Sequence, residues 1–540
     1  MHTKYNNITK VWTSPSKDKE YCGLGELILT KLKEQNQERA FELFYDRGIQ
    51  LTVGDIRRQT ITVAQNLQRI GVTKGDTVVM YSMSNEKVTP IAFACYTIGA
   101  PINFFETNLE GDDIKHVLQQ VDAKVIIIDE KYRSRLSEAL ESSNLPNLKH
   151  VLSLGSMNPS VNEVLFRECG DIDSFQPPQI EDPKTYPAAL LLTSGTTGLP
   201  KIIMHSHAVL TEGIFSWWNL ERGNKIFCFS PLRWISTVSI MLQPVFYEVE
   251  RIYTSQEPSG ILGKELIDSC SITHFFTVPA MYLDILKAAE TSGDPCSLSS
   301  LKIALVGGEP VSEALIEHFS KAVPNCKPAI LYGMTEFGGV LSSDEDIPQK
   351  NINGGELRRG FMVKIIDDND TPLGPNKMGQ LCVKRTSLEY LKYLKNDKAN
   401  KENFLEGGWL NTGDYGYMDS DNFLNIVTRY KYLVRSGGNI IIPNTVEKII
   451  GSHPRVQISV LIGHPNPEVE NDEIGTLFVV LRNDGGNSSK EIEKELMDLL
   501  KTKCTKEQIQ AVRHIKVISE MPLTSCGKVD RTTLKSMAIS

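Results

Sequence analysis

The chain has 540 residues, of which 41% are hydrophobic and 23% are charged, a composition typical of a globular protein with several domain-sized units. Its 66 acidic residues outnumber its 58 basic residues and give a formal net charge of −8. This acidic balance argues against a nucleic-acid-binding protein, which usually carries a basic excess.

The ten cysteines are scattered from Cys22 to Cys526, and no two of them form a Cys-x-x-Cys pair. This pattern predicts free thiols in a reducing compartment, not a disulfide framework or a zinc ribbon. The N-terminus lacks the apolar core of a secretory signal. The uncharged stretch 88–105 contains two prolines and is interpreted as a buried helix and strand, so we expect no transmembrane segment.

Short apolar runs alternate with helical patterns through the first 340 residues. Val125–Ile128 is apolar on both faces, as in strands that helices cover on each side, and this alternation predicts layered α/β subdomains. The expected strands are Thr77–Met80, Lys124–Asp129, His150–Leu154, Ala188–Leu192, Lys225–Phe229, Lys302–Val306 and Ala329–Tyr332.

Within the same region, residues 191–201 read LLTSGTTGLPK, and this stretch predicts a loop that binds a polyphosphate. Hydroxyls and backbone N–H groups donate to anionic oxygens, glycine permits close approach, and a lysine adds a mobile positive charge. The loop is not a Walker A motif, because Gly195 and Gly198 are too close together and Ile202, not Ser or Thr, follows Lys201. Its candidate ligands are Thr193, Ser194, Gly195, Thr196, Thr197, Gly198 and Lys201.

After about Gly354 the pattern changes to closely spaced strands, which predicts a β-rich subdomain over about 354–428. From about Lys431 strands alternate with helices again. We therefore expect an N-terminal domain over 1–430 and a small α+β C-terminal domain over 431–540. The expected elements are the strands Met362–Asp367, Gly379–Val383, Phe423–Val427, Ile458–Gly463, Gly475–Leu481 and His514–Ile518, and the helix Glu491–Leu500.

The loop at 191–201 resembles the signature of the adenylate-forming, or AMP-binding, superfamily, which includes acyl-CoA synthetases, 4-coumarate–CoA ligases, luciferase-like enzymes and peptide-synthetase adenylation domains. Six further segments resemble the superfamily in the same order, so the resemblance covers essentially the whole chain. It is strongest to the luciferase-like and 4-coumarate-ligase branch. The segments are 99–103, 306–310, 332–336, 412–414, 428–431 and 522–528.

The resemblance implies which residues contact ATP and Mg²⁺. Gly308, Glu309 and Pro310 would form a wall of the adenine pocket, and Tyr332, followed by Gly333, would lie beside the adenine. Thr335 would donate to a phosphate, and Glu336 would help to hold Mg²⁺. The residue types suit these roles, because an aromatic ring can stack on a base and a carboxylate is a hard ligand for a hard cation.

The resemblance also implies a second group of site residues nearer the C-terminus. Asp414 would accept hydrogen bonds from the ribose hydroxyls, and Arg429 would reach the nucleotide. Lys431 would be the hinge of a mobile C-terminal domain. Lys528 would bridge the substrate carboxylate and the α-phosphate, where a cation stabilises the charge that develops in the transition state.

Departures from the superfamily pattern lie where the acyl group and coenzyme A would bind. Trp234 stands at the position of an aromatic or histidine gate, and Leu331 replaces a glycine of luciferase-like members, which implies a shorter acyl pocket. On the coenzyme A side, Arg435 replaces a lysine and Thr445 a frequent glutamate. The resemblance places Gly437 and Gly438 at the thiol tunnel.

These observations predict an ATP-dependent carboxylic acid–CoA ligase that forms an acyl-AMP intermediate, releases pyrophosphate and then transfers the acyl group to coenzyme A. One alternative is a luciferin-type monooxygenase that uses the same adenylation. Another is a non-catalytic binding protein with the same fold. The sequence identifies neither the acid nor the oligomeric state.

Two secondary expectations concern metal binding and location. His205 and His207 would share one face of a strand by alternation, but no cysteine or carboxylate partner is evident and we expect no zinc site. Relatives are often peroxisomal, whereas the C-terminal Met-Ala-Ile-Ser is not a Ser-Lys-Leu signal. We expect an intracellular protein of the cytoplasm or the peroxisome.

Overall fold

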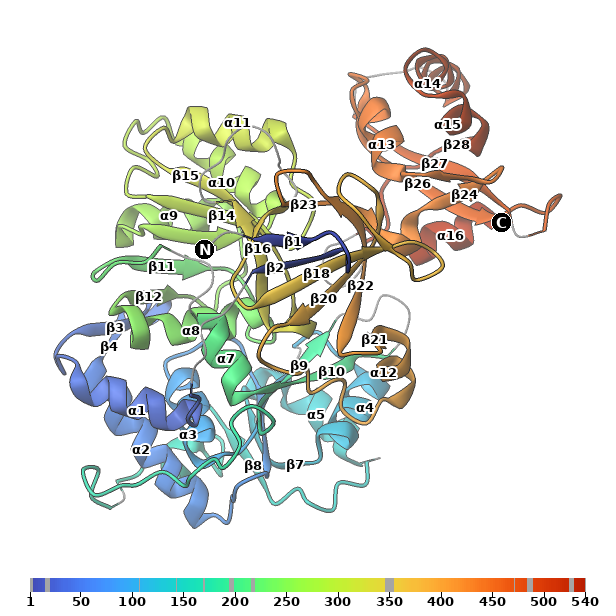
Figure 1. The fold of residues 1–540 in the computed structure, drawn as a ribbon. Helices are drawn as coiled ribbons and strands as arrows, with labels where there is room; N and C mark the ends of the chain where they lie inside the picture. Colours follow the sequence, from blue (N-terminus) through green and yellow to red (C-terminus); the bar gives the residue numbers. More distant parts are fainter. Residues whose placement is uncertain are drawn as a thin grey trace. The chain divides into compact units, whose positions relative to one another are not determined.

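The structure is a computed structural model that contains both helices and strands (Figure 1). It describes residues 3–14, 20–105, 107–141, 143–168, 170–193, 199–214, 219–344, 354–470, 472–482, 489–523 and 529–539. The chain forms two compact units. Unit 1 comprises Met1–Lys364, Cys382–Asn411 and Met418–Asn425, and unit 2 comprises Ile365–Leu381, Thr412–Tyr417 and Ile426–Ser540.

The first layer of unit 1 is a six-stranded sheet with the order β10-β9-β6-β5-β7-β8. All neighbouring strands are parallel except β9 and β10, which form an antiparallel hairpin. The strands are β5 (Thr77–Tyr81), β6 (Ile102–Phe104), β7 (Ala123–Ile128), β8 (His150–Ser153), β9 (Pro187–Thr193) and β10 (Lys201–Ser206).

Helices cover both faces of this sheet, and the alternation of side chains along each strand decides which face each residue meets. Val78 and Met80 pack in the cluster that includes α1, α2 and α3, whereas Val79 and Tyr81 pack against α4 and α5. The two groups of helices lie on opposite sides of the sheet in Figure 1. The helices are α1 (Leu24–Glu34), α2 (Val53–Arg69), α3 (Val88–Ile98), α4 (Gly111–Val121), α5 (Arg133–Glu141) and the short α6 (Val161–Val164).

The second layer of unit 1 is a mixed sheet in which β3, β12, β11, β13, β14 and β15 are successive parallel neighbours. β4 pairs antiparallel with β3, and β16 and β17 continue the other side antiparallel. The strands are β3 (Ala40–Phe44), β4 (Ile49–Thr52), β11 (Lys225–Cys228), β12 (Glu250–Tyr253), β13 (His274–Thr277), β14 (Ile303–Gly307), β15 (Lys327–Met334), β16 (Gly339–Asp344) and β17 (Gly354–Leu357).

Two helical groups also cover the second sheet. Helices α9, α10 and α11 pack on one face through residues such as Leu266, Tyr282 and Phe319. On the other face, Ile240 of α8 packs with Leu305 and Leu331. The helices are α7 (His207–Ile214), α8 (Ile235–Tyr247), α9 (Gly260–Cys270), α10 (Pro279–Ser292) and α11 (Glu313–Ala322).

Between residues 354 and 429 the described elements are mainly short strands. In unit 1, residues 361–363 of β18 pair antiparallel with β2, and Phe404 and Leu405 pair antiparallel with the start of β22. The elements are β1 (Lys4–Asn6), β2 (Val11–Ser14), β18 (Phe361–Ile366), β19 (Pro372–Leu373), β20 (Gly379–Arg385), α12 (Asp397–Asn403), β21 (Phe404–Leu405), β22 (Trp409–Met418) and β23 (Phe423–Arg429).

The C-terminal part of unit 2 is a three-stranded sheet, β26-β27-β28, beside the hairpin β24–β25. Leu461 and Leu477 pack with α13 and α14 on one face, whereas Ile462 and Phe478 pack with Leu534 of α16 on the other. The elements are β24 (Val434–Ser436), β25 (Asn439–Ile441), α13 (Pro443–Gly451), β26 (Val456–Pro465), β27 (Glu473–Leu481), α14 (Ser489–Lys503), α15 (Lys506–Ala511), β28 (Val512–Val517) and α16 (Arg531–Ile539).

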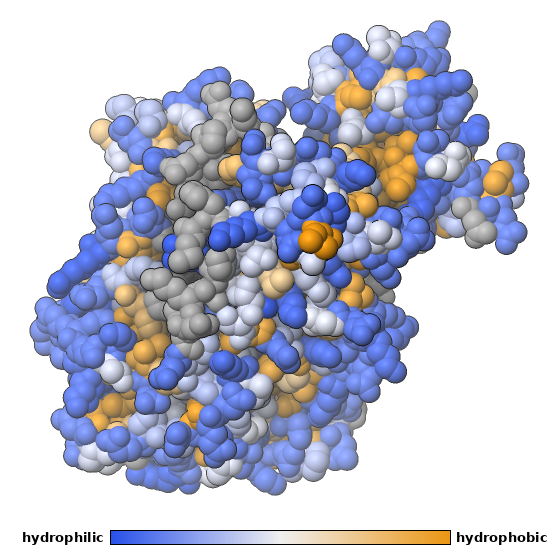
Figure 2. All heavy atoms as spheres, viewed as in Figure 1, coloured by the Kyte–Doolittle hydropathy of each residue, from blue (hydrophilic) through white to orange (hydrophobic). Residues whose placement is uncertain are grey.

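These observations confirm the α/β class. The expected domain division at residue 430 and the β-rich subdomain over 354–428 stay predictions. None of the described helices is long and apolar enough to cross a membrane, and all described cysteines are free. The face shown in Figure 2 is mainly hydrophilic, with hydrophobic residues in small separate groups. Among the described residues, the most exposed large hydrophobic side chains are Ile8 at 93%, in the turn between β1 and β2, and Ile261 at 74%, in α9.

Candidate active site

The hairpin β9–β10 carries the ends of the predicted phosphate loop. Thr193, the last residue of β9, pairs directly with Lys201, the first residue of β10. The apolar run of β9 is buried on both faces, and Thr193 itself is only 8% exposed, so the strand fixes where the loop begins. The predicted phosphate ligands Ser194, Gly195, Thr196, Thr197 and Gly198 lie outside the described residues.

The predicted adenine wall follows the end of β14. Gly307 pairs with Leu331 of β15, and a Cβ atom at Gly307 would lie 2.4 Å from the carbonyl oxygen of Leu331. Only glycine permits this close approach. Gly308 then adopts a φ of +85°, which turns the chain at Glu309 and Pro310. Because β14 and β15 are parallel neighbours, this turn follows β14 at the same edge of the sheet as the end of β15, which contains Tyr332.

The end of β15 carries the second predicted nucleotide segment. The pairing with β16 shifts register between Tyr332 and Gly333, and Thr335–Phe337 then forms a 3-10 turn, η3. The ring of Tyr332 lies 6.2 Å from that of Phe337, which is completely buried. The structure therefore brings together the sequence-predicted residues Tyr332, Thr335 and Glu336 on one strand end and its turn.

A buried ion pair that the sequence analysis did not predict supports the η3 turn. The Arg385 guanidinium donates to the Phe337 carbonyl oxygen from Nε at 3.2 Å and from Nη2 at 2.6 Å. Its Nη1 lies 2.8 Å from Glu212 Oε2, and the Arg385 side chain is 2% exposed. The Tyr21 hydroxyl donates a hydrogen bond to Glu212. Burial, together with this carboxylate, raises the pKa of Tyr21, so its hydroxyl keeps its proton.

His205 contacts the same turn from β10. Its ring is hydrogen-bonded to the backbone of Thr335, and burial lowers its pKa to about 3, with a further lowering by the Arg385 charge. His205 is therefore a neutral residue behind the turn. This ring and Arg385 hold the backbone from which Thr335 and Glu336 project.

The expectation that His205 and His207 share a strand face is wrong. β10 ends at Ser206 and His207 begins α7, because the Ser206 hydroxyl accepts the Val209 N–H at 3.2 Å and caps the helix start. His207 instead accepts the Leu24 N–H through Nδ1 at 3.0 Å.

Tyr393 connects two predicted site residues, and the sequence analysis did not predict it. Its hydroxyl donates to Glu336 Oε1 at 3.0 Å. Its ring centroid lies 5.3 Å from Lys201 Nζ, within the range of a cation–π contact. Tyr393 is 5% exposed, so it is a buried contact between the β10 lysine and the η3 carboxylate.

The two predicted acyl-pocket residues lie in the second sheet layer of unit 1. Trp234 immediately precedes α8, and the Arg233 guanidinium lies 5.5 Å from its ring centroid. Leu331 is 5% exposed and packs with Ile240 of the same helix. Their role in acyl binding stays a prediction.

Within unit 2, the predicted ribose ligand and arginine form an ion pair. Arg429 Nε lies 3.0 Å from Asp414 Oδ1, and the Asp414 side chain is 8% exposed. Arg429 Nη1 also donates to the Thr412 carbonyl oxygen at 2.8 Å, and Asp414 N–H donates to Thr412 Oγ1 at 3.1 Å. The structure thus brings Asp414 and Arg429 into contact. Two residues that the resemblance assigns to the same nucleotide must lie close together, and these two do.

The hinge candidate Lys431 lies in the 3-10 turn η4 (Tyr430–Tyr432), with its ammonium 5.3 Å from the Tyr432 ring centroid. Arg435 lies four residues further along the chain, in β24. Its guanidinium lies 4.6 Å from the Tyr430 ring centroid, and its backbone N–H donates to Glu473 at 2.9 Å. These contacts fix both residues within unit 2.

Gly437 and Gly438 form the tip of the β24–β25 hairpin, with φ values of +57° and +75°. Positive φ at both central residues is what a type I′ turn needs, which explains the glycine pair. Nearby, Thr445 accepts a hydrogen bond from Gln508 Nε2 at 2.8 Å. Lys528, the predicted catalytic lysine, lies outside the described residues.

The geometry of the described residues suits a metal that arrives with its phosphate ligands. Among the described residues, no three His, Cys, Asp or Glu side chains are grouped so that they could hold a metal ion together. Mg²⁺ in phosphate-transfer sites typically takes one or two carboxylates plus phosphate oxygens and waters. The single carboxylate of Glu336, held by Tyr393, fits this requirement.

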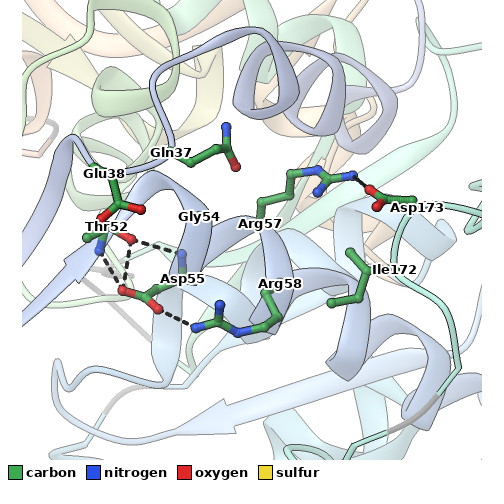
Figure 3. Close-up of a pocket in the computed structure, with 9 residues that line it drawn as sticks. All are labelled: Gln37, Glu38, Thr52, Gly54, Asp55, Arg57, Arg58, Ile172 and Asp173. Atoms are coloured by element: carbon green, nitrogen blue, oxygen red, sulfur yellow. Dashed lines mark hydrogen bonds and ion pairs between the residues drawn. The ribbon is translucent and has the colours of Figure 1, made fainter.

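A polar cavity of about 390 Å³ lies at the start of α2, and none of the predicted site residues lines it. Figure 3 shows that each of the two arginines that line it pairs with an aspartate. Arg57 contacts Asp173 at 2.7 Å, Arg58 pairs with Asp55, and Asp55 also closes the helix cap with Thr52. These contacts are those of a capped, charged helix start.

Comparison with known proteins decides the family. The profile described as AMP-binding enzyme matches residues 30–389, more than half of the chain, and the profile of the AMP-binding enzyme C-terminal domain matches residues 445–528. The chain belongs to the AMP-binding enzyme family. The resemblance stated from the sequence is therefore confirmed.

Curated relatives and solved structures extend this result over nearly the whole chain. The chain is 26% identical over 508 residues to 4-coumarate–CoA ligase CCL1 of Humulus lupulus, covering 91% of this chain and 89% of that protein. It is 24% identical over 516 residues to peroxisomal OPC-8:0-CoA ligase 1 of Arabidopsis thaliana, with the same coverage. The crystal structure of the anthranilate CoA ligase AuaEII with anthranoyl-AMP has a similar fold, with a TM-score of 0.83, 21% identity, and coverage of 96% and 97% of the two chains.

Proposed function

We propose that this AMP-binding enzyme is an ATP-dependent carboxylic acid–CoA ligase. The observation that carries the proposal is that the chain matches both the large and the C-terminal domain of the family and aligns along its length with CoA ligases. Residues 193, 201, 332, 335 and 336, which the resemblance assigns to ATP, lie on adjacent strand ends of one unit, and their contacts support the assignment.

The first step joins the acid to AMP. A carboxylate oxygen attacks the α-phosphorus of ATP, and the bond between the α-phosphorus and pyrophosphate breaks. Lys201, Thr335 and Lys528 supply donors for the phosphate charge, and Lys528 approaches both the carboxylate and the α-phosphate. Asp414 and Arg429 orient the ribose. Bound with ATP, Mg²⁺ would neutralise phosphate charge, and Glu336 would provide its protein ligand.

The second step transfers the acyl group. The thiol sulfur of coenzyme A attacks the acyl carbonyl carbon, AMP leaves, and the thiol proton passes to solvent or a nearby base. Arg435, Gly437 and Gly438 act on the coenzyme A side, and movement about Lys431 separates the two steps. Trp234 and Leu331 limit the acyl pocket. The substrate is a carboxylic acid whose class, fatty, aromatic or other, the test below identifies, and the cytoplasm or the peroxisome is the location we propose.

The proposal is tested by measuring pyrophosphate release from ATP with short-chain, medium-chain, long-chain and aromatic acids, each with and without coenzyme A. We expect at least one acid to release pyrophosphate and to give an acyl-CoA only when coenzyme A is present. If no acid in a broad panel releases pyrophosphate, the chain is a binding protein and the proposal is wrong. Light emission with luciferin, ATP and oxygen would favour a monooxygenase instead.

A further inference from the structure

Tyr393 lies in the irregular segment between β20 and α12, yet the backbone fixes it to β10. It forms an antiparallel bridge with Ile203. On either side, Met204 N–H donates to the Lys392 carbonyl oxygen at 3.1 Å and Leu394 N–H donates to the Ile202 carbonyl oxygen at 2.8 Å. Tyr393 is therefore attached to the strand that Lys201 begins.

Its own backbone and ring are also held. Asn400 accepts the Tyr393 N–H at 2.8 Å and donates to the Tyr393 carbonyl oxygen at 2.9 Å. The Tyr393 ring packs edge-on against Phe404 with the centroids 5.7 Å apart. Because the residue is also almost completely buried, its hydroxyl is presented at a fixed point.

The hydroxyl donates a hydrogen bond to the Glu336 carboxylate, and the ring forms a cation–π contact with the Lys201 ammonium. A neutral donor at a fixed point restrains the rotamer of the carboxylate that accepts from it. Such partners of metal-binding carboxylates change metal affinity or activity by about 10- to 100-fold when they are mutated. A nearby tyrosine provides a contrast, since the buried hydroxyl of Tyr390 has no hydrogen-bond partner in the described part of the chain.

We propose that Tyr393 is a positioning residue of the adenylation site, which orients Glu336 toward Mg²⁺-bound ATP through its hydroxyl and steadies Lys201 through its ring. This inference rests on the proposed function and adds a residue to the same site. It acts through Glu336, so its effect must depend on both the metal and that carboxylate.

The test is the binding of ATP to the full-length protein by isothermal titration calorimetry, in excess Mg²⁺ and in EDTA. Tyr393→Phe keeps the ring that faces Lys201 and removes only the hydroxyl. We expect it to weaken Mg²⁺-dependent ATP binding about tenfold and to change metal-free binding by less than about twofold. Tyr390→Phe, the matched control, should bind like the wild type in both conditions.

A double-mutant cycle with Glu336→Ala separates positioning from a general structural effect. We expect Tyr393→Phe to add nothing to the loss caused by Glu336→Ala, because the hydroxyl acts only through that carboxylate. Thermal unfolding should show that all variants fold. Wild-type affinity in Tyr393→Phe, equal weakening with and without Mg²⁺, or multiplied effects in the double variant would each overturn the proposal. A wild-type protein that binds no ATP would instead reject the proposed function.

Discussion

At the residue scale, the Asp414–Arg429 pair shows how one contact prepares a site for a sugar. The carboxylate is 8% exposed and engaged by the guanidinium at 3.0 Å, so its orientation is set before any ligand arrives. Hydrogen bonds that involve a charged group contribute about 1.5–3 kcal/mol. An oriented carboxylate that accepts from ribose hydroxyls therefore discriminates in favour of a nucleotide.

Replacing Asp414 with asparagine tests this role. Asp414→Asn loses the ion pair and one acceptor for the ribose, and we expect the KM for ATP to rise about tenfold or more while the KM for the acid changes little. Steady-state pyrophosphate release measures both constants. The exposed Asp421→Asn is the control and should behave like the wild type. An unchanged KM for ATP in Asp414→Asn would remove Asp414 from the ribose site.

Lys528 acts in one half-reaction under the proposed mechanism. We expect Lys528→Ala to abolish acyl-AMP formation and largely to spare the thiolation of pre-made acyl-AMP, because only the first step builds negative charge at the α-phosphate. The two half-reactions are followed separately by mass spectrometry. Lys535→Ala, an exposed lysine of α16, should affect neither. Equal loss of both half-reactions would contradict the assignment.

At the element scale, the η3 turn depends on Arg385. Because Arg385 and Glu212 are 2% and 14% exposed, Arg385→Met leaves a nearly buried carboxylate without its cation, and such losses cost about 3–5 kcal/mol. We expect a clear fall in the calorimetric midpoint of thermal unfolding of unit 1.

The double variant Arg385→Met/Glu212→Leu provides the comparison, since it removes both charges. It should recover the part of the loss that comes from the unpaired Glu212 carboxylate, but not the part that comes from the two lost hydrogen bonds to the Phe337 carbonyl oxygen. If Arg385→Met unfolds at the wild-type temperature, or if the double variant is as stable as the wild type, Arg385 does not support the turn as described.

Most of the expected strands occur within one or two residues of their predicted bounds. The apolar runs of β5 and β7 are buried on both faces, which makes them clear in the sequence. The expected Lys124–Asp129 is β7 (Ala123–Ile128), and stretch 88–105 contains α3 and β6 as expected. Short strands were missed. β12 (Glu250–Tyr253) and β13 (His274–Thr277) have only four residues each, and polar residues begin both, so neither gives a clear apolar run.

The site was predicted where the chemistry is contained in a local motif and was missed where distant residues complete it. Thr335 and Glu336 stand in one contiguous segment. Tyr393 is 57 positions from Glu336, and Arg385 is 173 positions from Glu212. No periodicity or spacing in a single sequence links such pairs, because only the fold brings them together.

At the scale of the whole molecule, buried histidines make stability depend on pH. Burial lowers the pKa of His205 to about 3 and those of His207 and His274 to about 4, from about 6.5 in the unfolded chain. Below pH 6.5 the unfolded chain therefore binds more protons than the folded protein. Linkage then requires stability to fall as the pH falls from about 6.5 toward 4.

We expect each of these histidines to remove about 2 kcal/mol of stability between pH 7 and pH 5, seen as a falling midpoint of thermal unfolding. His205→Asn should unfold at a lower temperature but with a shallower pH dependence. A His205→Asn variant with the full wild-type slope would show that this histidine is not buried in its neutral form.

The central claim is that the carboxylate attacks the α-phosphate, and an isotope experiment tests it most directly. An accepted acid labelled with ¹⁸O in its carboxylate is turned over with ATP, Mg²⁺ and coenzyme A, and the AMP is examined by mass spectrometry. The account predicts that each AMP gains one ¹⁸O atom, because the bridging oxygen of acyl-AMP leaves with AMP when the thiol attacks the carbonyl. Unlabelled AMP, or label found in phosphate or pyrophosphate, would contradict it.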